Sequence, residues 1–187
     1  MTAMLKIDRL SKTYNNGTVA LREVSLTVEP GEFVVVLGKS GSGKSTLMRC
    51  INRLVEPSSG SIFLDGEEVT GASPKRLREL RKKTGMIFQQ YNLIPRYSVQ
   101  SNSLMGRLAS ISSVASMMNC FLGEDVARSR QVLDRLGLAD KCSHRSEELS
   151  GGQQQRVGLA RALMQGAELI LADEPVSSLD PAASRQI

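Results

Sequence analysis

The segment 38–45 contains the residue types that could bind a phosphate group. It reads Gly38-Lys39-Ser40-Gly41-Ser42-Gly43-Lys44-Ser45, which fits the pattern G-x-x-x-x-G-K-[ST]. Glycines let the backbone curl so that its N–H groups converge on phosphate oxygens, and a helix N-terminus adds a favourable dipole. Lys44 would supply a charge for the β- and γ-phosphates, and the Ser45 hydroxyl would suit Mg²⁺. The alternative is a glycine-rich turn without a ligand, which the neighbouring elements disfavour.

Two acidic residues provide a second group that could do chemistry. Asp173 and Glu174 directly follow the aliphatic run 169–172. An acid at the C-terminal end of such a strand can hold magnesium beside a phosphate loop. A second acid can act as general base and polarise an attacking water. Taken alone, the pair would fit an acidic strand end that turns into solvent; together with the phosphate loop it predicts a nucleotide site.

The elements that must position these residues follow a strand–loop–helix order. The run 33–37 is continuous, apolar and β-branched, which predicts a strand buried on both faces of a parallel sheet. Residues 46–54 after the loop read as a helix. Further strands are expected over 5–10, 19–28, 61–64, 84–88 and 169–172. The order predicts an α/β nucleotide-binding core.

Three more helices are expected, over 74–83, 104–122 and 124–136. The first contains the basic residues Lys75, Arg76, Arg78, Arg81, Lys82 and Lys83. A nucleic-acid surface is one interpretation. No aromatic residue lies among these cations to stack on a base, so a solvated helix face is favoured and no nucleic-acid partner is expected.

The composition sets limits on the class of protein. The chain has 187 residues, 41% of them hydrophobic and 23% charged, with a net charge of +5. These values fit one globular domain and favour an anionic ligand or surface. Its three cysteines form no C-x-x-C pair, so reduced thiols are expected. The first ten residues lack the pattern of a signal peptide, and no run reaches the length of a membrane span. Association with a membrane would therefore come through a partner.

The segment Leu149-Ser150-Gly151-Gly152-Gln153-Gln154-Gln155-Arg156 resembles the LSGGQ signature of ABC ATPases. Its distance from the run 169–174 also matches that family. Gln89 resembles the glutamine of the Q-loop, and Tyr14 resembles the aromatic residue that stacks on adenine. Residues 177–180 resemble the D-loop. The resemblance covers the whole chain and implies a P-loop ABC ATPase fold with an N-terminal antiparallel β region and an inserted helical subdomain.

The resemblance implies a role for each matching residue. Glu174 would be the general base, Gln89 would sense the metal, and Mg²⁺ would be held by Ser45, Gln89 and Asp173. ATP would be bound by Tyr14, Gly38, Lys39, Ser40, Gly41, Ser42, Gly43, Lys44, Ser45, Thr46, Ser150, Gly151, Gly152, Gln153 and Asp180. Two copies would enclose two ATP molecules head to tail. The implied partners are membrane permease subunits and, through the complex, a periplasmic or extracellular substrate-binding protein. The expected location is peripheral, on the cytoplasmic face of the inner membrane.

Three stretches narrow the resemblance to the ATP-binding subunits of bacterial phosphonate importers: 50–57, 85–93 and 153–181. Importers of polar amino acids share many of these residues and remain an alternative. A non-hydrolysing nucleotide-binding remnant is a second alternative, and a soluble ABC ATPase of DNA repair or translation is a third.

The sequence departs from the family pattern at three places. Lys39 stands where proline is usual in the phosphate loop, and Ser101 replaces a glutamate that is common after the Q-loop. The family also continues past residue 181 through a helix and a core strand with a switch histidine. The single histidine, His144, precedes the signature, so a C-terminally truncated chain is expected. Within it, residues 1–91 and 150–187 would form the core and 92–149 the helical subdomain.

Overall fold

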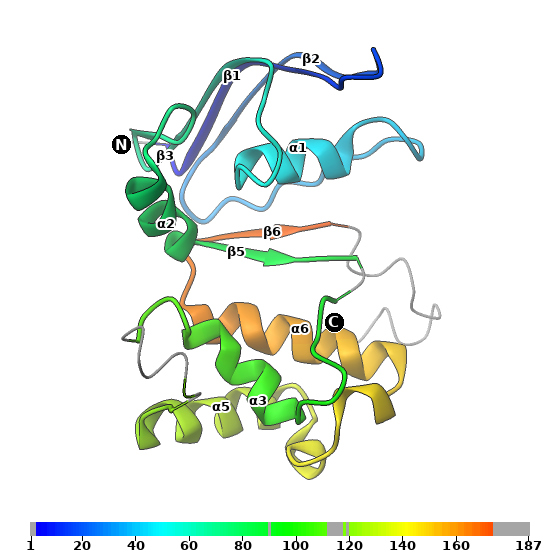
Figure 1. Ribbon diagram of the computed structural model, residues 1–187, viewed down its shortest axis with the longest axis vertical. Coiled ribbons are helices and arrows are strands. Elements are labelled where there is room, and N and C mark those ends of the chain that lie inside the picture. The colour runs from blue at the N-terminus through cyan, green and yellow to red at the C-terminus, as the bar shows by residue number, and fades with distance from the viewer. Residues whose placement is uncertain (1–2, 90, 112–117, 119, 174–187) are drawn as a thin grey trace. The chain divides into compact units, whose positions relative to one another are not determined.

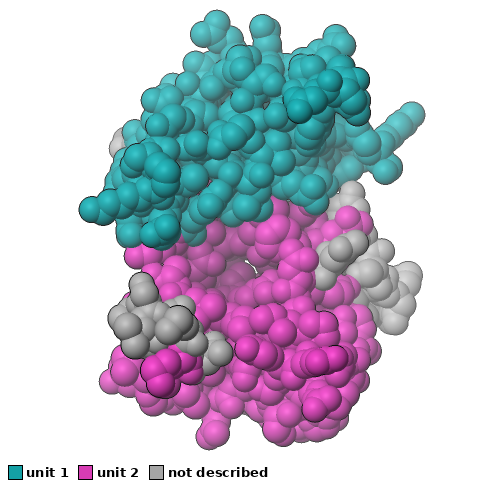
Figure 2. Space-filling view, viewed as in Figure 1, with its two compact units in different colours: residues 1–81 teal, residues 82–187 magenta. Residues whose placement is uncertain are grey.

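The structure is a computed structural model that describes residues 3–89, 91–111, 118 and 120–173. The chain divides into two compact units, Met1–Arg81 and Lys82–Ile187, which have separate colours in Figure 2. Each unit is described by itself.

The first unit is built on an antiparallel sheet whose strands are ordered β2-β1-β3-β4. Leu5 pairs with Val28 on one side and with Leu64 on the other. Leu5 and Ile7 are almost fully buried, as the predicted alternation requires, and Leu10 is buried because the register shifts between Ile7 and Leu10, where Arg9 has a positive φ of 44°. The strands are β1 Leu5–Thr13, β2 Val19–Val28, β3 Ser59–Leu64 and β4 Glu67–Glu68 (Figure 1). The structure confirms the predicted strands at 5–10, 19–28 and 61–64.

Helix α1, Lys44–Ile51, begins directly after the glycine loop. Gly43 is its N-cap residue and has a left-handed backbone, with φ of 94°. One face of the helix buries Leu47, Cys50 and Ile51. The helix begins two residues before the predicted 46–54, directly after its N-cap Gly43. It ends three residues earlier than predicted, where the backbone turns left-handed again at Arg53, with φ of 47°.

Helix α2, Pro74–Lys83, has the predicted bounds. Its cations are largely engaged with the protein itself. Arg76 pairs with Glu67, and Lys83 lies 3.8 Å from Glu168. Arg81 donates to two backbone carbonyls. These contacts agree with a solvated helix face, some of whose cations bind other groups of the protein.

The prediction of a doubly buried strand at 33–37 is wrong. The structure has no strand there, and Phe33 and Leu37 are 90% and 86% exposed. An apolar run becomes a buried parallel strand only where neighbouring strands satisfy its backbone groups and helices cover both faces. None of the described strands pairs with this run.

The second unit contains two parallel strands, β5 Thr84–Ile87 and β6 Leu169–Ala172. Their register pairs Thr84 with Leu169 and Ile87 with Ala172. The structure confirms both predicted strands, with β5 one residue shorter than expected. All four residues of β5 are buried.

Helices of the second unit enclose a separate aliphatic core. The cluster consists of Val99, Leu133, Leu138, Leu149, Val157 and Ala160. Figure 1 shows helices α3, α5 and α6 running beside one another in this unit. They are α3 Val99–Leu104, α5 Gly123–Arg135 and α6 Gly151–Gln165, with short 3-10 helices at Met105–Arg107, Ala139–Lys141 and Ser146–Glu148. Helix α5 matches the prediction at 124–136 within one residue.

The predicted helix at 104–122 is wrong over its described part. Residues 105–107 form a 3-10 helix, 108–110 a turn, and 120–122 have no regular structure. Residues 112–117 and 119 lie outside the described residues. Gly106, within the 3-10 segment, lies against α6, since a methyl group there would lie 2.1 Å from the carbonyl oxygen of Arg161. After α3 the described chain therefore continues as a short 3-10 turn packed on α6, in place of one long helix.

Over the described ranges, no helix combines the length and the apolar character needed to span a membrane.

Candidate nucleotide-binding site

The glycine loop of the first unit curls around the side chain of Lys44. Its Nζ atom donates to the carbonyl oxygens of Gly38 at 2.9 Å and Lys39 at 3.1 Å. The amide of Ser42 donates to the carbonyl of Lys39 at 3.2 Å, which closes a turn inside the loop. Lys44 is thus held across the loop at the N-terminus of α1, and a helix N-terminus preceded by a glycine loop is a favourable place for an anion.

Two glycines of this loop lie close to other atoms, and at Gly43 the backbone of a neighbouring strand leaves no room for a side chain. A methyl group at Gly38 would lie 2.5 Å from Ser42 Oγ, and one at Gly43 would lie 2.3 Å from the carbonyl oxygen of Ala20. Gly41 and Gly43 also have positive φ, 78° and 94°. The curled shape therefore depends on glycine at these positions.

Tyr14 lies at the first turn of α1. Its hydroxyl is 3.2 Å from Thr46 Oγ1, so the two predicted ligands Tyr14 and Thr46 lie together. The ammonium of Lys12 is 5.2 Å from the centre of the Tyr14 ring, within range of a cation–π contact. Sequence reasoning missed Lys12, whose only signal is that it lies near the end of β1, two residues before the aromatic that follows the strand.

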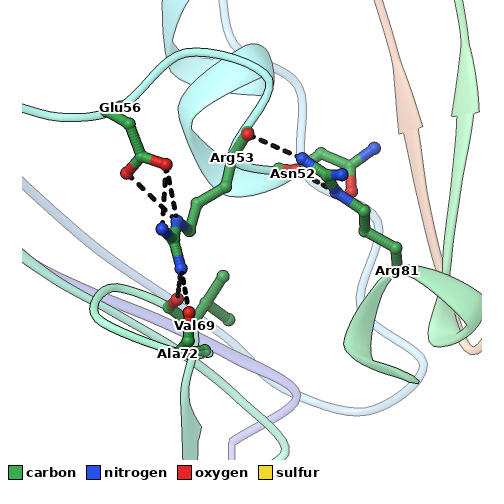
Figure 3. A network of polar contacts seen from close by, with 6 residues as sticks. All are labelled: Asn52, Arg53, Glu56, Val69, Ala72 and Arg81. Carbon is green, nitrogen blue, oxygen red and sulfur yellow. Dashed lines mark hydrogen bonds and ion pairs between the residues drawn. The ribbon is translucent and has the colours of Figure 1, made fainter. Parts of the chain in front are cut away.

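The far end of α1 is anchored by two arginines (Figure 3). Arg81 donates to the carbonyls of Asn52 at 3.0 Å and Arg53 at 2.7 Å, just past the helix C-terminus. Arg53 donates to the carbonyls of Val69 and Ala72 at 3.0 and 2.8 Å. Its guanidinium also pairs with Glu56 at 2.9 Å. Carbonyls left over at a helix end need such donors, and here they fix the helix whose N-terminus carries Lys44 and Ser45.

In the second unit, Gln89 and Asp173 follow the ends of neighbouring parallel strands. Ile87 pairs with Ala172, and the amide of Asp173 donates to the carbonyl of Ile87 at 3.0 Å. Asp173 is 4% exposed. The carboxyl ends of adjacent parallel strands meet at one edge of a sheet, so the structure brings these two predicted residues to the same edge.

The segment 150–153 forms the N-terminus of helix α6. The Ser150 side chain accepts from the Gln153 amide at 3.4 Å, and Gln153 Oε1 accepts from the Ser150 amide at 3.0 Å. This reciprocal pair is a capping box. Gly151 is exposed, and the first turn contains no acidic side chain. The positive end of the α6 dipole is therefore left available to an anion.

Burial shifts the pKa of two side chains that the motifs do not include. Burial raises the pKa of the Cys50 thiol, which packs under α1. Burial lowers the pKa of the Arg161 guanidinium on α6. Arg161 was also missed from the sequence; its signal is a lone charge among small and apolar residues, in Leu159-Ala160-Arg161-Ala162-Leu163.

Several predicted site residues lie outside the described residues. These are Glu174 and the D-loop segment with Asp180. Among the described residues, no group of three or more His, Cys, Asp or Glu side chains could hold a metal ion by itself.

The sequence profile of the ABC transporter family matches residues 21–177. The chain belongs to the ABC transporter family. This match spans the phosphate loop, the Q-loop and the signature. Membership indicates a nucleotide-binding chain and confirms the ABC ATPase fold that the motifs predicted.

Relatives of this ABC chain have high identity along nearly its whole length. The phosphonates import ATP-binding protein of Bdellovibrio bacteriovorus is 53% identical over 180 residues, covering 96% of this chain and 69% of the relative. A phosphonates import ATP-binding protein of Halalkalibacterium halodurans is 50% identical over 184 residues, covering 98% of this chain and 75% of the relative. The chain is thus shorter than these relatives.

Solved ABC structures have the same fold. A dimeric bacterial ABC transporter cassette superposes with a TM-score of 0.84 at 34% identity, covering 98% of this chain and 79% of that one. The same cassette in a post-hydrolysis state bound to ADP and Pi gives 0.83 at 34% identity, with the same coverage. A Clostridium perfringens protein of an ABC transporter complex gives 0.81 at 30% identity, covering 100% of this chain and 71% of that one.

The residues present fit a nucleotide phosphate and Mg²⁺. The loop around Lys44 has a shape that a side chain at Gly43 would obstruct. The hydroxyls of Ser45 and Thr46 lie in the first turn of α1, and oxygen ligands of this kind suit Mg²⁺.

Proposed function

We propose that this chain is the ATP-binding and ATP-hydrolysing subunit of an ABC importer whose cargo is a phosphonate. The observation that carries the proposal is the 53% and 50% identity to relatives named phosphonates import ATP-binding proteins. The local geometry of the phosphate loop supports the ATP-binding part. The cargo itself would be selected by other subunits, so the identity of the relatives is the support for phosphonate.

Binding of ATP would begin at the loop. The amides of residues 38–43 and the N-terminus of α1 would surround the phosphates, and Lys44 Nζ would exchange its contacts with the loop carbonyls for phosphate oxygens. Tyr14, fixed by Thr46, would offer its ring to the adenine. Ser150, Gly151, Gly152 and Gln153 would present the positive end of α6 to the ATP held by a second copy.

Hydrolysis would use the two residues after β6. Glu174 would act as general base, taking a proton from the attacking water. Ser45, Gln89 and Asp173 would hold Mg²⁺, which when bound neutralises developing charge on the phosphate oxygens. Lys44 would stabilise the same charge from the loop. Asp180 would complete the ATP contacts from the D-loop.

The assembly follows from the same assignment. The structural neighbours include a dimeric cassette. We infer two copies of this subunit docked on permease subunits at the cytoplasmic face of the membrane, with a substrate-binding protein completing the complex. Within the chain, 1–91 and 150–187 would act as the ATPase core and 92–149 as the helical subdomain that faces the permease.

The test is ATP hydrolysis in proteoliposomes. The chain is reconstituted with the permease and binding protein of a phosphonate importer, and hydrolysis is measured with a phosphonate or with a polar amino acid. We expect the phosphonate alone to stimulate hydrolysis. In Glu174→Gln, hydrolysis should be lost while ATP binding persists. Stimulation by the amino acid would assign the rival cargo. Equal hydrolysis by Glu174→Gln would contradict the assignment of the base.

A further inference from the structure

Phe88 and Tyr91 close a turn that contains Gln89, here called the Gln89 turn. Its last residue and the residue after it have an unusual backbone conformation. Tyr91 and Asn92 both have positive φ, 55° and 47°, although neither is glycine. Left-handed conformations of non-glycine residues cost free energy and persist where the surrounding structure fixes them. The contacts of this pair should therefore show what fixes it.

One side chain of α6 binds both residues. Arg161 donates from Nη2 to the carbonyl oxygen of Tyr91 at 2.7 Å and from Nη1 to that of Asn92 at 2.8 Å. The planar guanidinium donates to the two carbonyls through two different nitrogens, in a fixed fork that the single nitrogen of a lysine does not provide. Burial lowers the pKa of Arg161, and the desolvated guanidinium makes its hydrogen bonds to these two carbonyls.

Tyr91 also lies along the surface of α6. A methyl group at Gly158 would lie 3.9 Å from the Tyr91 carbonyl oxygen and 4.0 Å from its Cβ. A methyl group at Gly151 would lie 3.9 Å from the Tyr91 hydroxyl. The side chain therefore extends along the helix from Gly158 to the signature glycine at its N-terminus.

The Gln89 turn is closed by the same residue. The Tyr91 amide donates to the carbonyl of Phe88 at 3.0 Å, so Gln89 lies inside a turn whose last residue is bound to α6. The hydrogen bonds run from Arg161 to Tyr91 and from Tyr91 to Phe88, on either side of Gln89.

We propose that Arg161 is a positioning residue that fixes the Gln89 turn to the signature helix, so that Gln89 and Ser150 move as one body. The inference rests on the proposed roles of Gln89 and of the signature. Arg161 acts only through the backbone of Tyr91 and Asn92. Any displacement of the Q-loop would then carry the N-terminus of α6 with it.

Hydrogen exchange of the full chain tests the positioning independently of activity. We expect the Tyr91 amide to exchange at least about tenfold faster in Arg161→Met, because loss of both donors frees the strained backbone. Arg161→Lys should give an intermediate rate. Arg128→Met, an exposed arginine on α5, is the matched control and should leave the rate unchanged. An unchanged rate in Arg161→Met would overturn the proposal; if that variant does not fold, the rate in Arg161→Lys decides in the same way.

Steady-state hydrolysis supplies the second readout. A positioning role predicts a fall in kcat of about tenfold with KM for ATP changed less than about twofold, since the phosphate loop is untouched. A raised KM with unchanged kcat would contradict it. Gln89→Ala tests the proposed role of Gln89 separately from the positioning role of Arg161. Wild-type turnover in that variant would remove the proposed role of Gln89, whereas the exchange rates would still decide whether Arg161 holds the turn.

Discussion

The two units of this chain position their functional residues in different ways. In the first, Lys44, Ser45 and Thr46 are neighbours in sequence, and the loop's own carbonyls and glycines hold them. In the second, side chains from distant segments fix the backbone next to the functional residues themselves, whereas in the first such donors, Arg81 and Arg53, act at the far end of α1. Arg161 reaches Tyr91 across 70 positions, and Gln165 reaches the carbonyls of Lys82 and Thr84 at 3.1 and 3.0 Å.

This contrast has consequences for mutation. The phosphate loop depends on backbone conformation, so the sensitive positions are its glycines. The second unit depends on buried polar side chains that donate to carbonyls, so the sensitive positions are Arg161 and Asn102. The same type of substitution can therefore be harmless in one unit and strongly destabilising in the other.

The largest effect is expected for Gly43→Ala in the first unit. The added methyl group would lie 2.3 Å from the Ala20 carbonyl oxygen, at a residue with φ of 94°. We expect loss of about 3 kcal/mol or more of unfolding free energy, measured by urea titration, together with loss of ATP binding. Gly17→Ala is the control, since φ there is 81° and nothing lies within 4 Å. It should lose only about 1 kcal/mol. Equal losses would show that the close approach to Ala20 is unimportant.

The next effect is expected in the second unit, at Asn102. This residue is fully buried, accepts from the Ile94 amide at 2.8 Å, and donates to Ser146 Oγ at 2.7 Å. Asn102→Ala should lose about 2–4 kcal/mol of unfolding free energy, because the fully buried amide makes hydrogen bonds to the backbone of Ile94 and to the buried Ser146 hydroxyl that alanine cannot replace. Gln100→Ala, half-buried and with a 3.4 Å contact, should lose less than about 1 kcal/mol. A neutral Asn102→Ala would contradict the view that buried amides hold this unit together.

The smallest effect returns to the first unit, at Lys12. Its ammonium lies 5.2 Å from the centre of the Tyr14 ring. Lys12→Gln should weaken ATP binding by about twofold to fivefold, the size of a partly exposed cation–π contact, measured by calorimetric titration. Lys6→Gln, on an exposed position of the same strand, should have no effect. Equal weakening by both would indicate a general charge effect, not an ordered Tyr14 ring.

The sequence predicted elements well where one face or one turn decides the outcome. Strand β2, helix α2 and strand β6 have the expected bounds because their signals are local. These are a run of strand-forming residues in β2, a proline at the start of α2, and acidic residues directly after β6. The phosphate loop was equally readable, since its function lies in consecutive residues. The family resemblance then supplied the remaining motifs.

The failures have non-local causes. Residues 33–37 have the composition of a buried strand, but burial depends on partner strands elsewhere in the chain. Apolar residues at helical spacing over 104–122 do not form one helix in the described part, and the packing of the 3-10 segment at Gly106 against α6 is a contact that periodicity does not show. Arg161 acts on carbonyls about 70 positions away, and Asn102 reaches the hydroxyl of Ser146 across 44 positions, so no spacing rule indicates these partners.

The most direct test of the account is thermal unfolding of the chain with and without saturating Mg-ATP. Ligand at about a hundredfold over its Kd should add about 2.7 kcal/mol to the free energy of unfolding. For a chain of this size, the account predicts a cooperative transition that moves up by several degrees, and no movement in Lys44→Ala. A transition indifferent to Mg-ATP in the wild-type chain, or an equal rise in Lys44→Ala, would contradict ATP binding by the loop around Lys44.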